Sequence, residues 1–409
     1  MAERRTFIDI VKFPPAWRLW RETAAIIEAL TGNGGTARFV GGCVRDALIG
    51  LPTEDIDIAT DLLPDTVVER LKASGINALP TGRDHGTITA VIGKRTFEIT
   101  TLRVDAGTDG RHADVVFTED WEQDAERRDF TFNALYLDPL GELFDPMDGL
   151  PDLETGHVRF IGRADDRIAE DRLRVLRYFR FVARFDDANP EKDALIACRN
   201  AAKHLGSLSA ERIQKELLLL LATTNPVRSL DLMQKTGVLA AVFGRSFDLS
   251  SVTTLLSLPI RSNTLQRFAA LMGADAEAAI AVADKLKLPN RFKKRLMAAC
   301  GNDLTPDLSA TERDISLYHL GRQAFIDQTI LLWAKLASDM DMSDYLRQAE
   351  TWRAPQLPVT GHDLLDLGIA EGEDMGRLLK KIEKCWVSSG FKLTKPELLE
   401  LCLSRSADP

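Results

Sequence analysis

The chain has 409 residues, of which 45% are hydrophobic and 28% are charged, and its net charge at pH 7 is −9. This composition excludes a disordered chain, and the length predicts two to four domains or subdomains. The excess of acidic residues argues against a protein that coats nucleic acid by bulk electrostatics, although a local basic patch can still bind RNA.

The N-terminal sequence and the cysteines indicate a compartment. No run of 18 apolar residues occurs, and the N-terminus has no apolar core followed by a cleavage site, so we expect neither a membrane span nor a secretory signal. The five cysteines form no CxxC pair, which is typical of reduced thiols in a cytoplasmic protein. We therefore expect a cytoplasmic location.

The first 155 residues alternate helix and strand signals. An amphipathic helix is expected at 14–31, with prolines near its start and a glycine turn at its end. A second helix is expected at 65–75, and residues 105–115 are expected to form a loop. Short strands are expected at 37–42, 55–60, 85–93 and 95–103, with Gly93-Lys94 as a hairpin turn between the last two. This alternation predicts a mixed sheet domain with helices that ends near residue 155.

The remaining chain has a different pattern. After about residue 165, apolar residues recur every three or four positions and strand signals vanish, which predicts helices with breaks near 225, 289, 305 and 354–361. We expect an α+β fold in which a head of mixed sheet and helices precedes an elongated all-α arm. The expected division is a head at 1–155, a neck at 156–225, a helical body at 226–310 and a helical tail at 311–409.

Two aspartates lie two residues apart in the second expected strand. Residues i and i+2 of a strand point to the same face, so Asp55 and Asp57 are expected to lie about 6.6 Å apart on one face. Two carboxylates this close repel each other and favour a divalent cation between them. Two Mg²⁺ ions about 3.5–4 Å apart can activate a hydroxyl and stabilise a leaving pyrophosphate. Glu98, on the strand expected at 95–103, is the candidate third acid.

Each of these acids also fits an ordinary solvent-facing strand residue, and the preceding segment decides between the two interpretations. Gly41 and Gly42 follow a strand and precede a helix-like segment, so backbone N–H groups there can approach phosphate oxygens. Arg45 is placed to reach the same phosphates. A strand, a glycine pair, a helix and then a strand carrying DxD is the order expected of a nucleotidyl-transfer palm.

A charged segment much later in the chain predicts recognition of a base. Asp171 and Arg174 are expected on one helix, where residues i and i+3 are neighbours. Cytosine and adenine both present an amine beside an unprotonated ring nitrogen, which aspartate and arginine can pair with. Uracil and guanine present the reverse polarity, so the pair selects C and A without a template. Arg177 and Arg180 would serve the base or the triphosphate, although a solvated helix with ion pairs fits the same pattern.

These residues together resemble the class II tRNA nucleotidyltransferases, or CCA-adding enzymes, of the polymerase β-like superfamily, which also includes bacterial poly(A) polymerases. The resemblance is specific from about residue 36 to 225 and weaker at 286–296 and 359–382. The segments that carry it are GGCVRD with DID, ERRDFTFNAL (126–135), FDPMDGLPDLETGHVRFIG (144–162), EDRLRVLR (170–177) and SAERIQKELLLLL (209–221).

The resemblance implies roles for single residues. Asp55 and Asp57 would bind Mg²⁺. The residues implied to bind the incoming nucleotide are Gly42, Arg45, Arg128, Asp129, Asn133, Asp171, Arg174, Arg177 and Arg180. The implied reaction is attack of the tRNA 3′-hydroxyl on the α-phosphate of CTP or ATP, which needs positioning and charge neutralisation more than a protein nucleophile. The implied partners are tRNA, CTP and ATP, with no membrane and no obligate protein partner.

Alternatives remain open at this point. A poly(A) polymerase shares the head, but the stretch GRDHGTITAVIG and the acidic balance favour tRNA end-addition. Enzymes that add only CC or only A share every motif, and the role of 105–115 in a switch from C to A stays open. An inactive RNA-binding protein would not need both aspartates with the full arginine set, and an enzyme acting on a small molecule would not need the base-reading pair.

Binding of tRNA is expected in the helical arm. Lys293, Lys294 and Arg295 form a basic cluster suited to phosphates, and 380–394 adds further basic residues. An ordinary solvated helix face fits each cluster equally well.

Overall fold

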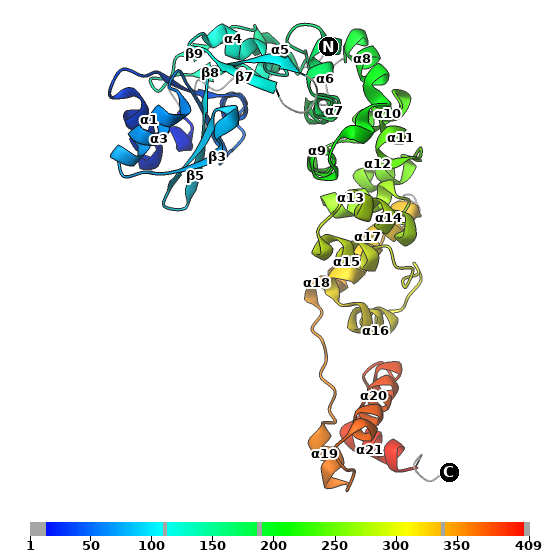
Figure 1. The fold of residues 1–409 in the computed structure, drawn as a ribbon. Coiled ribbons are helices and arrows are strands. Elements are labelled where there is room, and N and C mark those ends of the chain that lie inside the picture. The colour runs from blue at the N-terminus through cyan, green and yellow to red at the C-terminus, as the bar shows by residue number, and fades with distance from the viewer. Residues whose placement is uncertain (1–13, 109–112, 186–189, 337–339, 405–409) are drawn as a thin grey trace. The chain divides into compact units, whose positions relative to one another are not determined.

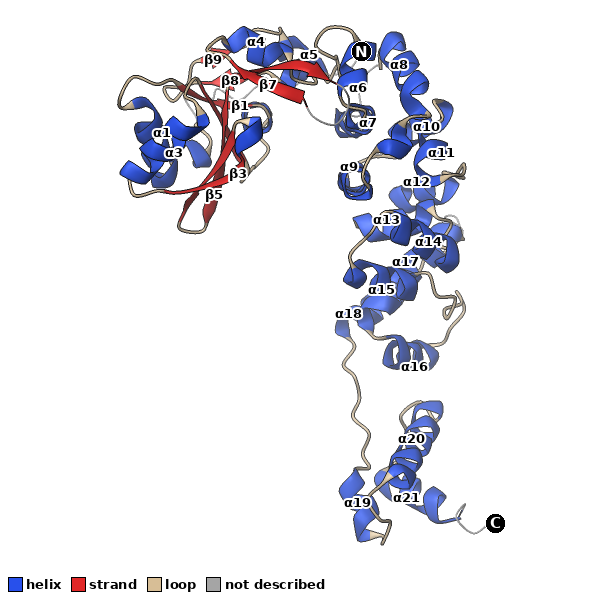
Figure 2. Ribbon diagram, in the orientation of Figure 1, coloured by secondary structure: helices blue, strands red, loops and turns tan. Residues whose placement is uncertain are grey.

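The computed structural model describes residues 14–108, 113–185, 190–336 and 340–404. The chain forms two compact units, Met1–Ser246 and Phe247–Pro409 (Figure 1). All strands of the described residues lie in the first unit, and the described part of the second unit is helical (Figure 2). The α+β class with a sheet-containing head is therefore confirmed, whereas the division into head, neck, body and tail stays a prediction.

The main sheet of the first unit has seven strands. They are β1 (Ala37–Val40), β2 (Ile56–Thr60), β3 (Asn77–Gly82), β4 (Thr87–Ile92), β5 (Arg95–Thr101), β8 (Tyr136–Leu137) and β9 (Leu143–Phe144). Their order is β3-β4-β5-β2-β1-β8-β9, and β2 and β5 form the parallel pair, whereas the other neighbours are antiparallel. The four predicted strands and the β4–β5 hairpin are confirmed. Strand β3 carries Pro80, which is tolerated because β3 lies at the sheet edge.

The loop expected at 105–115 is a second, two-stranded sheet instead. Strands β6 (Arg103–Thr108) and β7 (Ala113–Phe117) pair antiparallel, and residues 109–112 between them lie outside the described residues. The glycines and aspartates of this segment concealed the strand signal in the sequence, since such residues are depleted in strands.

The helix expected at 14–31 is divided in two. A 3-10 turn at Ala16–Leu19 (η1) is separated from α1 (Arg21–Thr31) by the extended residue Trp20. Trp17 is 3% exposed, and Arg18 donates a hydrogen bond of 2.6 Å from Nη2 to the carbonyl of Leu140. These two anchors fix the turn against the body of the unit, so it does not continue into α1.

The other helices of the first unit precede, connect and follow the strands. They are α2 (Gly42–Leu48), α3 (Pro64–Ala73), α4 (Trp121–Glu126), α5 (Gly149–Thr155), α6 (Ala164–Glu170), α7 (Leu173–Phe185), α8 (Lys192–Ala202), α9 (Ala210–Ala222), α10 (Val227–Lys235) and α11 (Val238–Phe243), with 3-10 turns at η2 (Arg83–His85), η3 (Thr131–Asn133) and η4 (Leu205–Ser207). Helix α7 buries most of its residues, and α9 packs along it. The predicted change to a helical texture is confirmed.

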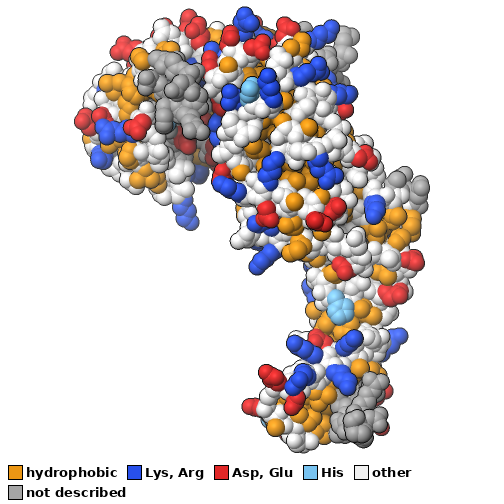
Figure 3. Space-filling model, turned by 45° about the vertical axis from the view of Figure 1, so that its right-hand side comes forward, with side chains coloured by type: hydrophobic (Ala, Val, Ile, Leu, Met, Phe, Trp, Pro, Cys, Tyr) orange, Lys and Arg blue, Asp and Glu red, His pale blue; other side chains and the backbone are white. Residues whose placement is uncertain are grey.

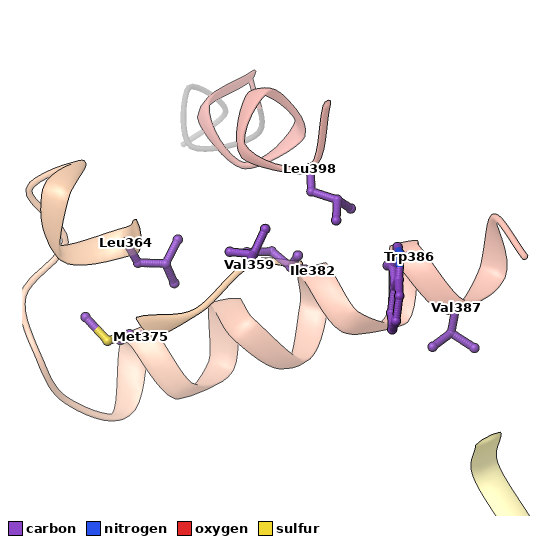
Figure 4. Packing of buried hydrophobic residues seen from close by; sticks show 7 residues of the cluster. All are labelled: Val359, Leu364, Met375, Ile382, Trp386, Val387 and Leu398. Carbon is purple, nitrogen blue, oxygen red and sulfur yellow. The ribbon is translucent and has the colours of Figure 1, made fainter. Parts of the chain in front are cut away.

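The second unit contains helices with the predicted breaks. They are α12 (Ser250–Ser257), α13 (Thr264–Leu271), α14 (Ala276–Lys285), α15 (Asn290–Ala299), α16 (Ala310–Leu320), α17 (Arg322–Lys335), α18 (Ser343–Thr351), α19 (Gly361–Asp366), α20 (Glu373–Ser388) and α21 (Lys395–Ser404). Val359, Ile382, Trp386 and Leu398 belong to an apolar cluster that joins α19, α20 and α21 (Figure 4). Within the ranges that the structure describes, no helix is both long and apolar enough to cross a membrane.

Candidate active site

A polar cavity of about 410 Å³ lies in the first unit. It collects every predicted site residue of this unit except Asp55 and Glu98. Its lining consists of Gly41, Gly42, Arg45, Asp57, Arg127, Arg128, Asp129, Asn133, Asp171, Arg174, Arg177, Arg180 and Phe181. The volume suits a small-molecule ligand such as a nucleotide, and the excess of arginine favours an anionic one.

The glycine pair forms the turn between β1 and α2. Gly41 has φ 71° and ψ −121°, a backbone conformation that residues other than glycine rarely adopt. Its N–H donates to the carbonyl of Leu135 at 3.0 Å, which ties the turn to the end of the RRDFTFNAL segment. Gly42 then begins α2, and both glycines line the cavity without a side chain, so a ligand can approach the backbone there.

Arg45 is buried beside this turn, with 5% of its surface exposed. Its Nε donates to Asp46 at 2.8 Å, and its Nη1 donates to the amide oxygen of Asn133 at 2.5 Å. Burial lowers the pKa of Arg45 to about 10, so its guanidinium remains charged at neutral pH. The residue is held in place by its neighbours and still lines the cavity, where phosphate oxygens would meet it.

The candidate acids come together through the parallel pairing of β2 and β5. Asp57 is the register partner of Glu98, so the two side chains share one face of neighbouring strands. Burial, and after it the charge of Glu98, raise the pKa of Asp57 to about 6. The prediction that Asp55 lies within the strand is wrong: β2 begins at Ile56, and Asp55 is an exposed residue just before it. Its charge nevertheless contributes to the raised pKa of Asp57.

The donor chemistry of these acids fits a hard divalent cation. Asp55, Asp57 and Glu98 offer carboxylate oxygens, which Mg²⁺ prefers, and a cation would relieve their mutual repulsion. Among the described residues, however, no three His, Cys, Asp or Glu side chains stand close enough together to hold a metal ion as they are.

Two adjacent arginines are held by one buried carboxylate. Asp124, 1% exposed, binds Arg127 at 2.7 Å and Arg128 at 2.9 Å, and it accepts a hydrogen bond of 2.8 Å from the hydroxyl of Tyr136. Burial alone would raise the pKa of Asp124, but the charges of Arg128 and Arg127 hold it at about 2. Asp124 thus fixes both arginines at the cavity wall.

Asp129 connects this segment to α7. Its Oδ2 accepts from Nε of Arg177 at 2.6 Å, and its Oδ1 accepts from the Asn133 side chain and from the backbone N–H of Phe130, each at 2.9 Å. Burial opposes ionisation, but Arg177 lowers the pKa of Asp129 to about 2. Asp129 is therefore a charged, fully engaged positioning group.

The expected base-reading pair has a different local structure from the one predicted. Asp171 has φ −144° and ψ 106° and ends α6, whereas α7 begins at Leu173. Its Oδ1 accepts from the backbone N–H of Leu173 at 3.0 Å, the interaction by which aspartate caps a following helix. The prediction that Asp171 and Arg174 lie on one helix is therefore wrong, although both line the cavity.

Each member of the pair has its own partner. Asp171 binds Arg212 at 2.7 Å, and Arg174 binds Glu170 at 2.6 Å and the carbonyl of Arg127 at 2.8 Å. A carboxylate oxygen and a guanidinium each have further hydrogen-bonding capacity, so these contacts leave both residues able to bind a base.

Sequence reasoning missed the roles of two residues on α9. Arg212 binds Asp171, and Glu216, 4% exposed, binds Arg180 at 2.5 Å and lies 3.9 Å from Arg177. Arg212 and Glu216 are four residues apart, so they lie on one face of α9. The spacing ERxxxE, which contains Arg212 and Glu216, was the signal available in the sequence. The partners of these two residues, Asp171 and Arg180, lie more than 30 residues away along the chain.

The predicted tRNA-binding residues lie on α15 in the second unit. Lys293 binds Asp284 at 2.7 Å, and Arg295 binds the buried Asp327 through Nε at 2.8 Å, whereas Lys294 is exposed. Lysine and arginine side chains also gather on the surface near the C-terminal helices (Figure 3). The binding role of these residues stays a prediction.

Comparisons with known proteins match this organisation. Residues 37–159 match the family described as poly A polymerase head domain, and residues 189–247 match a probable RNA and SrmB-binding site of polymerase A. The human mitochondrial CCA tRNA nucleotidyltransferase 1 is 35% identical over 400 residues, covering 92% of this chain and 88% of the relative. A CCA-adding enzyme of Lactobacillus delbrueckii is 31% identical over 392 residues, covering 93% and 97%.

Solved structures agree with the fold. The CCA-adding enzyme of Bacillus stearothermophilus in complex with CTP has a TM-score of 0.75 and 26% identity, covering 94% of this chain and 97% of that one. The Thermotoga maritima CCA-adding enzyme complexed with tRNA has a TM-score of 0.67 at 21% identity, covering 98% and 99%, which is a likeness of fold.

Proposed function

Since the chain belongs to the family of CCA-adding enzymes, we propose that it adds C, C and A to the 3′ end of tRNA from CTP and ATP without a template. The observation that carries this proposal is the cavity, whose lining combines the arginines Arg45, Arg128, Arg177 and Arg180 with Asp57 and with Asp171 and Arg174. A nucleotide bound there would have its phosphates near Asp57 and its base near the later pair. The reacting groups would need to be positioned and their charge neutralised, which this arrangement supports.

The proposed triphosphate site combines backbone and side-chain donors. The N–H groups of the Gly41-Gly42 turn and the guanidinium of Arg45 would bind phosphate oxygens. Arg128 and Arg177 would add positive charge. Asp124 holds Arg128 in position through an ion pair, and Asp129 does the same for Arg177. Pre-positioned donors of this kind stabilise developing charge at little reorganisation cost.

The proposed base site uses Asp171 as acceptor and Arg174 as donor. Asp171 would accept from the exocyclic amine of cytosine or adenine, and Arg174 would donate to the adjacent ring nitrogen. Uracil and guanine would leave both groups mispaired, at a cost of about 1–3 kcal/mol for each unsatisfied group. This discrimination depends on the fixed positions of the pair, which Arg212 and Glu170 provide.

We propose that Asp55 and Asp57 bind Mg²⁺, with Glu98 as the third acid beside them. A divalent cation held by these carboxylates would supply charge neutralisation and activation of an attacking hydroxyl. The raised pKa of Asp57 is consistent with the assignment, because burial and, after it, the charges of Glu98 and Asp55 destabilise its carboxylate, and a bound cation would offset both.

We also propose a cytoplasmic location, supported by the free thiols of Cys43, Cys198, Cys300 and Cys385. Binding of tRNA is assigned to Lys293, Lys294 and Arg295 on α15, with the exposed Lys380, Lys381 and Lys384 on α20 contributing.

The experiment that tests this proposal measures incorporation of each nucleotide. Purified protein with Mg²⁺ is given tRNA that ends before CCA and a single labelled nucleoside triphosphate. We expect label from CTP and none from UTP or GTP, and label from ATP only once the tRNA ends in CC. Asp57→Asn should reduce incorporation at least about 100-fold, whereas Glu69→Gln, an exposed change on α3, should have no effect. Incorporation of UTP as efficient as CTP, or an active Asp57→Asn variant, would reject the proposal.

A further inference from the structure

One aromatic ring stands among three arginines of the cavity. Phe181 on α7 lines the cavity, yet only 1% of its surface is exposed. The guanidinium carbon of Arg180 lies 4.1 Å from the ring centroid, that of Arg45 lies at 5.0 Å, and that of Arg177 lies at 5.8 Å. All three distances fall within the range of a cation–π interaction.

Burial disfavours the charged form of two of these arginines, Arg45 and Arg180, whereas Asp129 raises the pKa of Arg177. Each has a carboxylate partner: Asp46 for Arg45, Asp129 for Arg177 and Glu216 for Arg180. Burial nevertheless lowers the pKa of Arg45 and that of Arg180, and the nearby charge of Arg180 contributes to the lowering at Arg45. The negative face of an aromatic ring offsets such a cost without neutralising the charge that a phosphate needs.

The ring is itself fixed by other aromatic residues. It meets Phe130 edge-to-face at 5.3 Å and Phe132 at 5.1 Å, and it stacks on Phe185 at 6.1 Å. Phe130 and Phe132 lie between Asp129 and Asn133 in the sequence. The ring therefore has a defined position relative to that segment and to α7.

We propose that Phe181 is a positioning residue of the nucleotide pocket, whose ring holds the guanidinium groups of Arg45, Arg177 and Arg180 in place for a triphosphate. Nucleotide affinity then depends on the negative electrostatic potential of the ring face and not only on its volume. This inference rests on the proposed function of the cavity as a nucleotide site.

The test lowers the electron density of the ring face while the shape of the side chain is nearly kept. Phe181 is replaced by 4-fluoro-, 3,5-difluoro- and 3,4,5-trifluorophenylalanine, and the Kd for CTP and for ATP is measured without tRNA. We expect Kd to rise with each added fluorine, to about tenfold for the trifluoro ring. The KM for both nucleotides should rise in parallel while kcat stays within about twofold, since the interaction is uniform for substrate and transition state.

Two controls separate positioning from packing. The same fluorinated series at Phe179, which is fully buried in α7 and has no guanidinium over its ring among the described residues, should leave Kd unchanged. Phe181→Leu, which keeps an apolar side chain and removes the ring face, should raise Kd at least as much as the trifluoro ring. A Kd that stays constant through the Phe181 series, with unfolding midpoints also constant, would overturn the inference. Failure of the protein to extend tRNA would instead reject the proposed function, because the Kd series needs no tRNA.

Discussion

Replacing Glu216 by glutamine removes one negative charge from a buried position and nearly keeps the shape of the side chain. The carboxylate is 5% exposed and binds Arg180, whose side chain is 11% exposed, at 2.5 Å. It also lies 3.9 Å from Arg177. In the Glu216→Gln variant, Arg180 would keep its charge in a buried place without the carboxylate that it contacts, whereas Arg177 would retain its contact with Asp129.

The magnitude follows from the burial of both partners. Removal of one partner of a buried ion pair costs about 3–5 kcal/mol, and a glutamine oxygen that still accepts a hydrogen bond reduces this cost to about 2–3 kcal/mol. For a unit of this size, 1 kcal/mol shifts the midpoint of unfolding by about 2–4 °C, so the expected loss is about 4–12 °C. The KM for CTP and ATP should rise about tenfold, because Arg180 loses its fixed position.

The assay combines thermal unfolding with a double-mutant cycle. Glu216→Gln, Arg180→Met and the double variant are compared, with Glu69→Gln as a control for the loss of an exposed carboxylate. Coupling between residues in direct contact should reach about 2 kcal/mol. A coupling energy below about 0.5 kcal/mol, or a Glu216→Gln variant as stable as the control, would refute the assignment of Glu216 as the residue that positions Arg180.

The remaining predictions concern both units. Arg295→Met should destabilise the second unit by about 3 kcal/mol in urea unfolding, because Asp327 is fully buried and loses its bidentate partner; an unchanged midpoint would contradict this. Lys294→Ala should leave stability unchanged, weaken tRNA binding and reduce the salt slope of log K by about 1, and an unaltered slope would exclude a phosphate contact. A hydrogen bond to Asp152 raises the pKa of His157, so this contact stabilises the fold fully below the unfolded pKa of about 6.5 and is lost as pH rises through the raised value. The stability difference between the protein and His157→Asn should therefore shrink from pH 6 to 8, and a difference that widens would reject the contact.

Local sequence pattern was sufficient for much of the site. Residue type and order predict the Gly41-Gly42 turn, the strand that carries Asp57 and the segment Arg127-Arg128-Asp129. The structure brings all three into one cavity. The pairing of Asp57 with Glu98 was not readable in this way, since the parallel register of β2 and β5 is set by the intervening β3, β4 and α3.

The ion-pair and hydrogen-bond partners of individual side chains could not be predicted from the sequence. Lys293 and Arg295 look like a basic patch in the sequence, but Asp284 and Asp327 bind them from α14 and α17. Asp171 fits a helical pattern, but its backbone is extended where α6 ends, and its side chain accepts a hydrogen bond from the first residue of α7. Such choices depend on competing hydrogen bonds between distant residues, which periodicity does not encode.

The proposed enzyme adds C, C and A to tRNA at one cavity and then stops. The most direct test gives the protein Mg²⁺, CTP and ATP with three tRNAs, which end before CCA, before the final A, and after the complete CCA, and sequences the products. We expect the first two tRNAs to be extended to CCA and the third to remain unchanged. Long A tracts, or products that end at CC with ATP present, would contradict this expectation.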